Sequence, residues 1–145
     1  MAKQSYERIA NKMYADNLRH VTGVIGHHGA TNEEELNECG LSLFGSKWRG
    51  VFARDEKEWR NRSGKPYRIV NLDSRSGGMG GTHWTGVADD LVYCSFGEGG
   101  KLTTGGNFRH VDDDIEQTYS EENCGQRCLA WLMVYEKNPF LAKLV

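Results

Sequence analysis

The chain has 145 residues, with 18 lysines and arginines against 20 aspartates and glutamates, so its formal net charge is −2. This length suits a single domain, residues 1–145, whose core needs no disulfides. The charge balance excludes the strongly basic surface typical of general nucleic-acid or membrane binding. No apolar run marks a signal peptide or approaches membrane-spanning length, so we expect a soluble, non-secreted protein made in a reducing compartment.

The first quarter of the chain predicts a helix, a short strand and a loop. Four side chains recur at helical spacing within residues 5–17: Tyr6, Ile9, Ala10 and Met13. A strand is expected over residues 21–25, and a loop with two adjacent histidines over residues 26–29.

A second helix is expected to begin with a capping box formed by Thr31 and Glu34, in which each side chain bonds the other residue's backbone N–H. This helix should end near Gly45. Three of its side chains share one face: Leu36, Cys39 and Leu43. Cys39 is therefore expected to lie in the core.

The chain has four cysteines and no CxxC pair: Cys39, Cys94, Cys124 and Cys128. Scattered cysteines in a reducing compartment are mostly small buried hydrophobes. A zinc site built from Cys39, His27 and His28 lacks convincing ligand spacing. We therefore expect no metal and no cofactor.

The remaining elements follow from composition and periodicity. Residues 48–52 predict an extended edge, and residues 67–72 a central strand. Residues 83–88 and 91–96 predict a hairpin joined by a two-residue turn. A helix is expected over residues 124–137 and is ended by the proline that follows.

A candidate catalytic set emerges near these last elements. Cys124 begins the final helix, where unpaired N–H groups and the helix dipole stabilise a thiolate. His83 opens the hairpin and is a candidate base, while Gln117 is a candidate oxyanion donor together with the Cys124 backbone N–H. Gly125 removes side-chain bulk beside the sulfur. This set predicts a cysteine acyl-transfer enzyme.

These residues resemble the adenovirus-type cysteine proteases of DNA viruses and virophages, over about residues 36 to 135. The resemblance rests on Gly-Thr-His-Trp at 81–84, Tyr-Cys-Ser-Phe-Gly at 93–97, and Gln117 followed by Asn-Cys-Gly at 123–125. It implies an α+β fold, shared with the ubiquitin-like-protein-specific proteases, in which a central mixed sheet packs against the helix carrying the nucleophilic cysteine.

The same resemblance implies a function. The expected activity is that of an endopeptidase that cleaves capsid or virion precursors at small, glycine-containing sites. It would act in the host cytoplasm or nucleus and in the virion, with an activating peptide or DNA as a possible partner and no membrane partner. Substrate contacts are expected from Trp84, Gly81 and Asn123.

The residue that orients the histidine departs from the family pattern. An acid usually stands where this chain has Cys94. A turn at residues 89–90 makes His83 and Cys94 diagonal neighbours on one face of the hairpin. Asn71, Asp73 and Glu98 are alternative third members, and a dyad without one is equally compatible.

Three other functions remain open. The chain could be a deconjugase for ubiquitin-like modifiers, or a non-catalytic binding protein descended from a protease. Cys124 and Cys128 share a helix face and could form a redox pair, although Cys128 points toward the apolar stripe and fits packing better.

Overall fold

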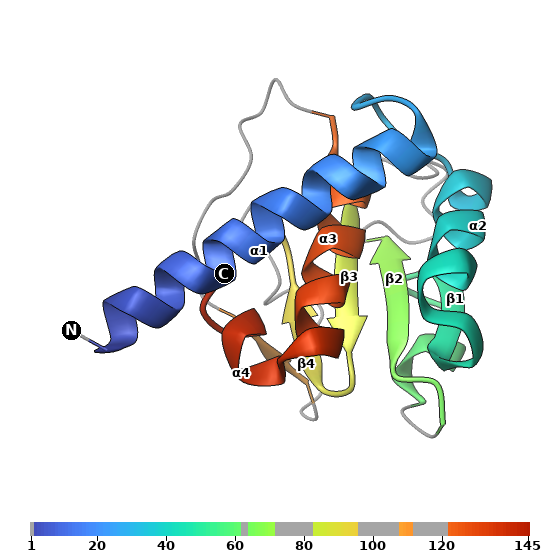
Figure 1. Ribbon diagram of the computed structural model, residues 1–145. Coiled ribbons are helices and arrows are strands. Elements are labelled where there is room, and N and C mark those ends of the chain that lie inside the picture. Colours follow the sequence, from blue (N-terminus) through green and yellow to red (C-terminus); the bar gives the residue numbers. More distant parts are fainter. Residues whose placement is uncertain (1, 62–63, 72–82, 96–107, 112–121) are drawn as a thin grey trace.

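The computed structural model describes residues 2–61, 64–71, 83–95, 108–111 and 122–145 (Figure 1). The described elements, in chain order, are α1 (Ala2–Ile25), α2 (Glu33–Phe44), η1 (Gly45–Lys47), β1 (Trp48–Ala53), η2 (Glu58–Arg60), β2 (Tyr67–Asn71), β3 (Trp84–Ala88), β4 (Leu91–Tyr93), β5 (Arg109–His110), α3 (Cys124–Lys137) and α4 (Pro139–Ala142). The fold is α+β, as the sequence predicts.

Among the described residues, one five-stranded sheet has the order β1-β2-β3-β4-β5. The pairs β1–β2 and β4–β5 are parallel, and the pairs β2–β3 and β3–β4 are antiparallel. The sheet is therefore mixed, which confirms that prediction. Among the strands that the structure describes, β1 lies at an edge and β2 lies between two partners, as predicted.

The hairpin of β3 and β4 has the expected register. Ala88 pairs with Leu91 and Gly86 with Tyr93, so Asp89 and Asp90 form the turn. Asp89 adopts a positive φ of 52°, a conformation that Asp tolerates better than most residues. The hydroxyl of Tyr135 on α3 donates to Asp89 Oδ2 over 2.6 Å, which ties the turn to the helix.

Helix α3 lies against one face of the sheet, and α1 runs across α3 (Figure 1). A Cβ on Gly86 of β3 would meet the Cys128 backbone oxygen of α3 at 3.4 Å, so helix and strand are in close contact. The fully buried apolar side chains of α3 are Cys128, Leu129, Ala130, Trp131, Leu132 and Val134. This larger core places the N-terminus of α3 at a fixed position beside the start of β3.

The opposite face of the sheet carries a second, smaller cluster. It consists of Trp59, Val70, Val87, Val92, Cys94 and Phe108, with Phe52 packed against it. Because side chains alternate along a strand, Val87 faces this cluster while Gly86 and Ala88 face α3. The sheet therefore separates two apolar layers of unequal size.

The structure corrects the predicted N-terminal region. Residues 21–25 are the last turn of α1 rather than a strand. Val21 lies seven positions after Tyr14 on the buried stripe of α1, so burial outweighs the strand preference of its β-branched neighbours. Tyr6 and Ile9, expected on the buried face, are 46% and 48% exposed.

The cap of α2 is one residue later than predicted. Asn32, not Thr31, is the N-cap, and Glu35, not Glu34, completes the capping box. Asn32 Oδ1 accepts from the Glu35 N–H, and Glu35 Oε1 accepts from the Asn32 N–H. The predicted end of the helix near Gly45 and the burial of Cys39 are confirmed.

No helix in the described part of the chain combines the length and apolar character needed to cross a membrane.

Candidate functional site

Cys124 is the first residue of α3, as predicted. The preceding Asn123 does not cap the helix with its side chain, because its Oδ1 accepts from Arg127 Nε over 3.0 Å. The cysteine thus stands beside helix N–H groups that the N-cap side chain leaves available for another acceptor.

The backbone N–H of Trp84 at the start of β3 points at the Cys124 sulfur, with N and Sγ 3.5 Å apart. Burial raises the pKa of the Cys124 thiol, and the backbone N–H groups of Trp84, Gly125 and Cys124 itself oppose that rise. Only 5% of Cys124 is exposed. The free protein therefore favours the protonated thiol, in a setting prepared to stabilise its anion.

His83 immediately precedes β3 and is half-buried. Its Nε2 lies 3.1 Å from Cys94 Sγ. The hairpin register, continued by one pair, places Thr85 opposite Cys94 and makes His83 the diagonal neighbour of that cysteine. The predicted contact between His83 and Cys94 is confirmed.

Cys124 and Cys94, the two cysteines near the start of β3, belong to different apolar clusters. Cys124 is part of the larger core on the α3 side, and Cys94 is part of the smaller cluster. The start of β3 contacts both cysteines. The Trp84 N–H points at the Cys124 sulfur, and the imidazole of the preceding residue, His83, contacts the Cys94 sulfur.

The other candidate site residues have mixed outcomes. Trp84 is buried, and its indole N–H donates to the Thr31 carbonyl over 3.1 Å, so it packs in the core. Asn123 is also buried and holds Arg127. A substrate contact by either residue stays a prediction. Four candidates lie outside the described residues: Gln117, Gly81, and the alternative orienters Asp73 and Glu98.

Asn71, the remaining alternative orienter, is the last residue of β2 and is buried. It pairs with Trp84 across the antiparallel β2–β3 ladder, one residue from His83. Its backbone position is compatible with a role near the histidine. The imidazole itself contacts the Cys94 sulfur through Nε2.

Cys128 follows Cys124 by one helical turn and is fully buried. Burial raises the pKa of its thiol well above the usual value, and the nearby Cys124 and Cys94 raise it further. All four cysteines are free thiols. A buried thiol with a raised pKa is a poor nucleophile, so these observations favour a packing role for Cys128 over a redox role.

A loop that the sequence did not connect with the site lies against the N-terminus of α3. Gln126 Nε2 donates to the carbonyls of His27 and Gly29 over 3.1 and 3.0 Å. A Cβ on Gly125 would meet Thr31 Oγ1 at 2.1 Å. Gly125 therefore makes room for this loop and for the start of α2. The glycine after the cysteine was the only sequence signal of that close approach.

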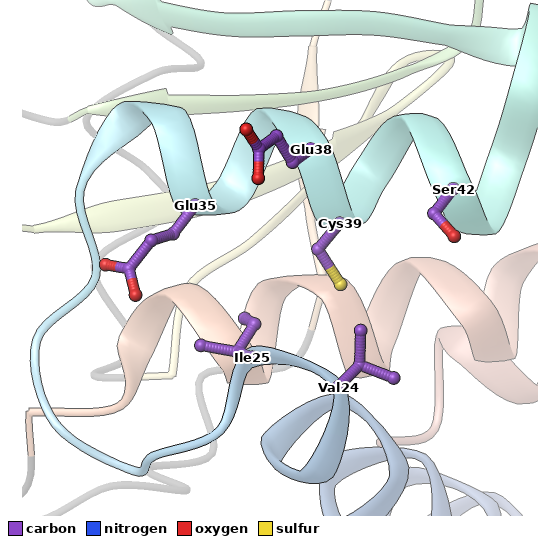
Figure 2. A pocket seen from close by; sticks show the side chains of 6 residues that line it. All are labelled: Val24, Ile25, Glu35, Glu38, Cys39 and Ser42. Carbon is purple, nitrogen blue, oxygen red and sulfur yellow. The ribbon is translucent and has the colours of Figure 1, made fainter.

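A cavity of about 180 Å³ lies between the end of α1 and the side of α2 (Figure 2). Its lining comprises Val24, Ile25, Glu35, Glu38, Cys39 and Ser42, none of which is a predicted site residue. Figure 2 shows the Cys39 sulfur directed toward the apolar side chains of Val24 and Ile25. The cavity is separate from the cysteine and histidine described above.

The loop at residues 26–29 is held by hydrogen bonds of His27. His27 Nε2 lies 2.7 Å from Glu35 Oε2, and His27 Nδ1 accepts from the Gly29 N–H. Within the described ranges, no group of three or more His, Cys, Asp or Glu side chains is placed to hold a metal ion.

Comparisons with family models, with curated proteins and with solved structures found no match to this chain.

Proposed function

We propose that the protein is a cysteine endopeptidase of the adenovirus type, with Cys124 as nucleophile and His83 as base. The observation that carries the proposal is the placement of the Cys124 sulfur at the start of α3, facing the N–H of the residue that follows His83. A helix N-terminus, a backbone donor and an adjacent imidazole are the groups that activate a thiol.

In the proposed reaction, His83 accepts the Cys124 thiol proton as the sulfur attacks the substrate carbonyl carbon. The carbonyl oxygen becomes an oxyanion, which accepts hydrogen bonds from the Cys124 N–H and the Gln117 side-chain amide. His83 then protonates the leaving amine, and an acyl-thioester remains. A water molecule, deprotonated by His83, hydrolyses this thioester and restores the thiol.

The burial of Cys124 has a consequence for the pH profile. Because burial raises the pKa of this thiol, the resting enzyme holds the proton and His83 must remove it during attack. We expect kcat/KM to rise with pH through neutrality. A preformed thiolate–imidazolium pair would instead give a plateau that begins below neutral pH.

The proposed substrates are virion precursor proteins cut at small, glycine-containing sites, in the host cytoplasm or nucleus and in the assembling virion. An activating peptide or DNA belongs to the same proposal. These features rest on the residues shared with the adenovirus-type proteases and on the α+β architecture that accommodates them.

The test is proteolysis of capsid precursors and of a glycine-containing peptide library, with cut sites mapped by mass spectrometry. Cys124→Ala should reduce kcat/KM by at least about 10⁴-fold, and Gln117→Ala by about 10²–10³-fold through kcat. Cleavage only of a ubiquitin-like fusion would make the protein a deconjugase. Full activity in Cys124→Ala would overturn the assignment of the nucleophile.

A further inference from the structure

Cys94 and His83 form a hydrogen-bonded pair, which the proposed peptidase reaction does not use. The Cys94 sulfur lies 3.1 Å from His83 Nε2, and the β3–β4 register fixes both backbone positions. Cys94 directly follows β4, and His83 directly precedes β3. Two strands of the same hairpin therefore hold a thiol against an imidazole.

The imidazole of His83 is the basic group in direct contact with the Cys94 thiol. The other buried members of the smaller cluster are apolar: Trp59, Val70, Val87, Val92 and Phe108. From α3, the titratable neighbour of Cys94 is Cys128, whose fully buried thiol keeps its proton. A proton leaving Cys94 therefore has His83 as a direct acceptor, because the two atoms are already within hydrogen-bonding distance.

We propose that Cys94 is an oxidation site for hydrogen peroxide, at which His83 promotes the reaction. The Cys94 proton passes to His83 Nε2, and the thiolate attacks one oxygen of the peroxide. An S–O bond forms as the O–O bond breaks, so the sulfur is oxidised by two electrons and the peroxide is reduced. The leaving hydroxide takes the proton from the His83 imidazolium, and the products are a sulfenic acid and water.

Oxidation would change what the imidazole contacts. A sulfenate, or a sulfinate after a second equivalent of peroxide, presents an anionic oxygen where the thiol presented sulfur. That oxygen accepts a hydrogen bond from His83 Nε2–H more strongly than sulfur does. This inference goes beyond the peptidase proposal and does not require it.

Cys39 provides a matched internal control for the test. Cys39 and Cys94 are equally buried, with 4% of each residue exposed. Burial raises the pKa of the Cys39 thiol, and its sulfur faces aliphatic side chains in the small cavity (Figure 2). The two residues are therefore matched in exposure, although Cys39 also lines a cavity, and the histidine variants show how much of any rate difference comes from His83.

The experiment treats the wild-type protein and Cys124→Ala with hydrogen peroxide and a dimedone trap at neutral pH, and follows each cysteine by peptide mass spectrometry. Each unit by which a thiol pKa falls gives a net gain of about threefold in rate, since nucleophilicity falls as thiolate rises. We expect Cys94 to be trapped about three- to tenfold faster than Cys39 in both proteins.

Replacing His83 tests whether the histidine or the burial of Cys94 determines its rate of oxidation. His83→Gln keeps a polar side chain but accepts no proton, so trapping at Cys94 should fall to the Cys39 rate while Cys39 is unchanged. His83→Ala provides a second variant, with circular dichroism to establish that each is folded. Equal trapping of Cys94 and Cys39 in the wild-type protein, or an unchanged Cys94 rate in both histidine variants, would overturn the proposal. Neither outcome depends on peptidase activity.

Discussion

The two faces of the sheet differ in what covers them and in what they contribute to the site. On the α3 side, helices bury a continuous core in which Cys124 is held at a helix N-terminus. On the other side, the described cover is a small cluster around Trp59 and Phe108, whose rings lie 5.1 Å apart. The proposed nucleophile, Cys124, thus belongs to the larger core, while the proposed base, His83, contacts a cysteine of the smaller cluster.

A buried arginine shows how the smaller cluster is held. Arg68 on β2 is fully buried, and its guanidinium donates to the carbonyls of Trp59, Pro66 and Asp89. It also lies 5.6 Å from the centre of the Phe108 ring. Backbone carbonyls and aromatic rings stabilise the charge, so this face depends on a few directed contacts. The larger core depends on many apolar ones.

The largest expected effect compares one tryptophan from each face. Trp131 and Trp59 are both fully buried, and each indole N–H donates to a backbone carbonyl over 2.9 Å. Trp131 also stacks on Tyr93 at 5.4 Å between ring centres. We expect Trp131→Ala to lower the free energy of unfolding by about 5 kcal/mol and Trp59→Ala by about 3 kcal/mol.

Urea unfolding followed by circular dichroism measures both tryptophan variants. Trp59→Ala should remain folded at room temperature but should alter the environment of the His83–Cys94 pair, because Trp59 and Cys94 share a cluster. Equal losses of stability in the two variants would contradict the proposed difference between the faces.

Much of the fold could be predicted from local patterns. The bounds of α3 and the two-residue turn between β3 and β4 agree with the prediction because periodicity and turn chemistry act over a few residues. The last turn of α1 was predicted wrongly as a strand. Its conformation is decided by the packing of α1 against other helices, chiefly α3, and no local pattern encodes that packing.

The features of the candidate site also divide into those set by local sequence and those set by distant contacts. The position of Cys124 at a helix start and the proximity of His83 to Cys94 follow from element boundaries and hairpin register, so the sequence predicts them. The burial of the Cys124 thiol and the loop packed on Gly125 depend on residues about 95 positions earlier in the chain, as the Gln126 contacts to His27 and Gly29 show. Contacts at that separation have no local signature.

The second prediction tests how tightly the larger core fixes the position of Cys124, the proposed nucleophile. A Cβ on Gly125 would lie 2.1 Å from Thr31 Oγ1 and 2.8 Å from Leu36 Cδ2, so Gly125→Ala must displace the loop or α3. We expect a loss of about 2–3 kcal/mol in unfolding free energy, because overpacking outweighs the better helix propensity of alanine. Urea unfolding measures this loss.

Gly23→Ala is the matched control for that variant. Gly23 also lies in a helix, but nothing stands within 4 Å of its added Cβ. The substitution should therefore raise the unfolding free energy by about 0.5–1 kcal/mol, opposite in sign to Gly125→Ala. If both alanine variants are stabilised, the loop does not pack on α3 as closely as described.

The smallest expected effect concerns the carboxylate of Glu35, which accepts hydrogen bonds from His27 and from the Asn32 N–H. The hydrogen bond from His27, followed by that from the Asn32 N–H, holds the pKa of Glu35 below its ordinary value. A lowered folded-state pKa contributes stability above the unfolded-state value, and that contribution is lost as pH falls through the folded-state value. Glu35→Gln keeps a capping-box acceptor but removes the charge. Because the His27 and Glu35 side chains are 40% and 33% exposed, we expect a loss below about 1 kcal/mol at pH 6, and this loss should shrink as the pH falls below the ordinary pKa of a glutamate. Glu34→Gln removes a carboxylate from the same helical turn and is the control in acid and urea titrations. If Glu35→Gln and Glu34→Gln have the same pH dependence, the effect comes from the helix dipole and the His27 contact contributes nothing measurable.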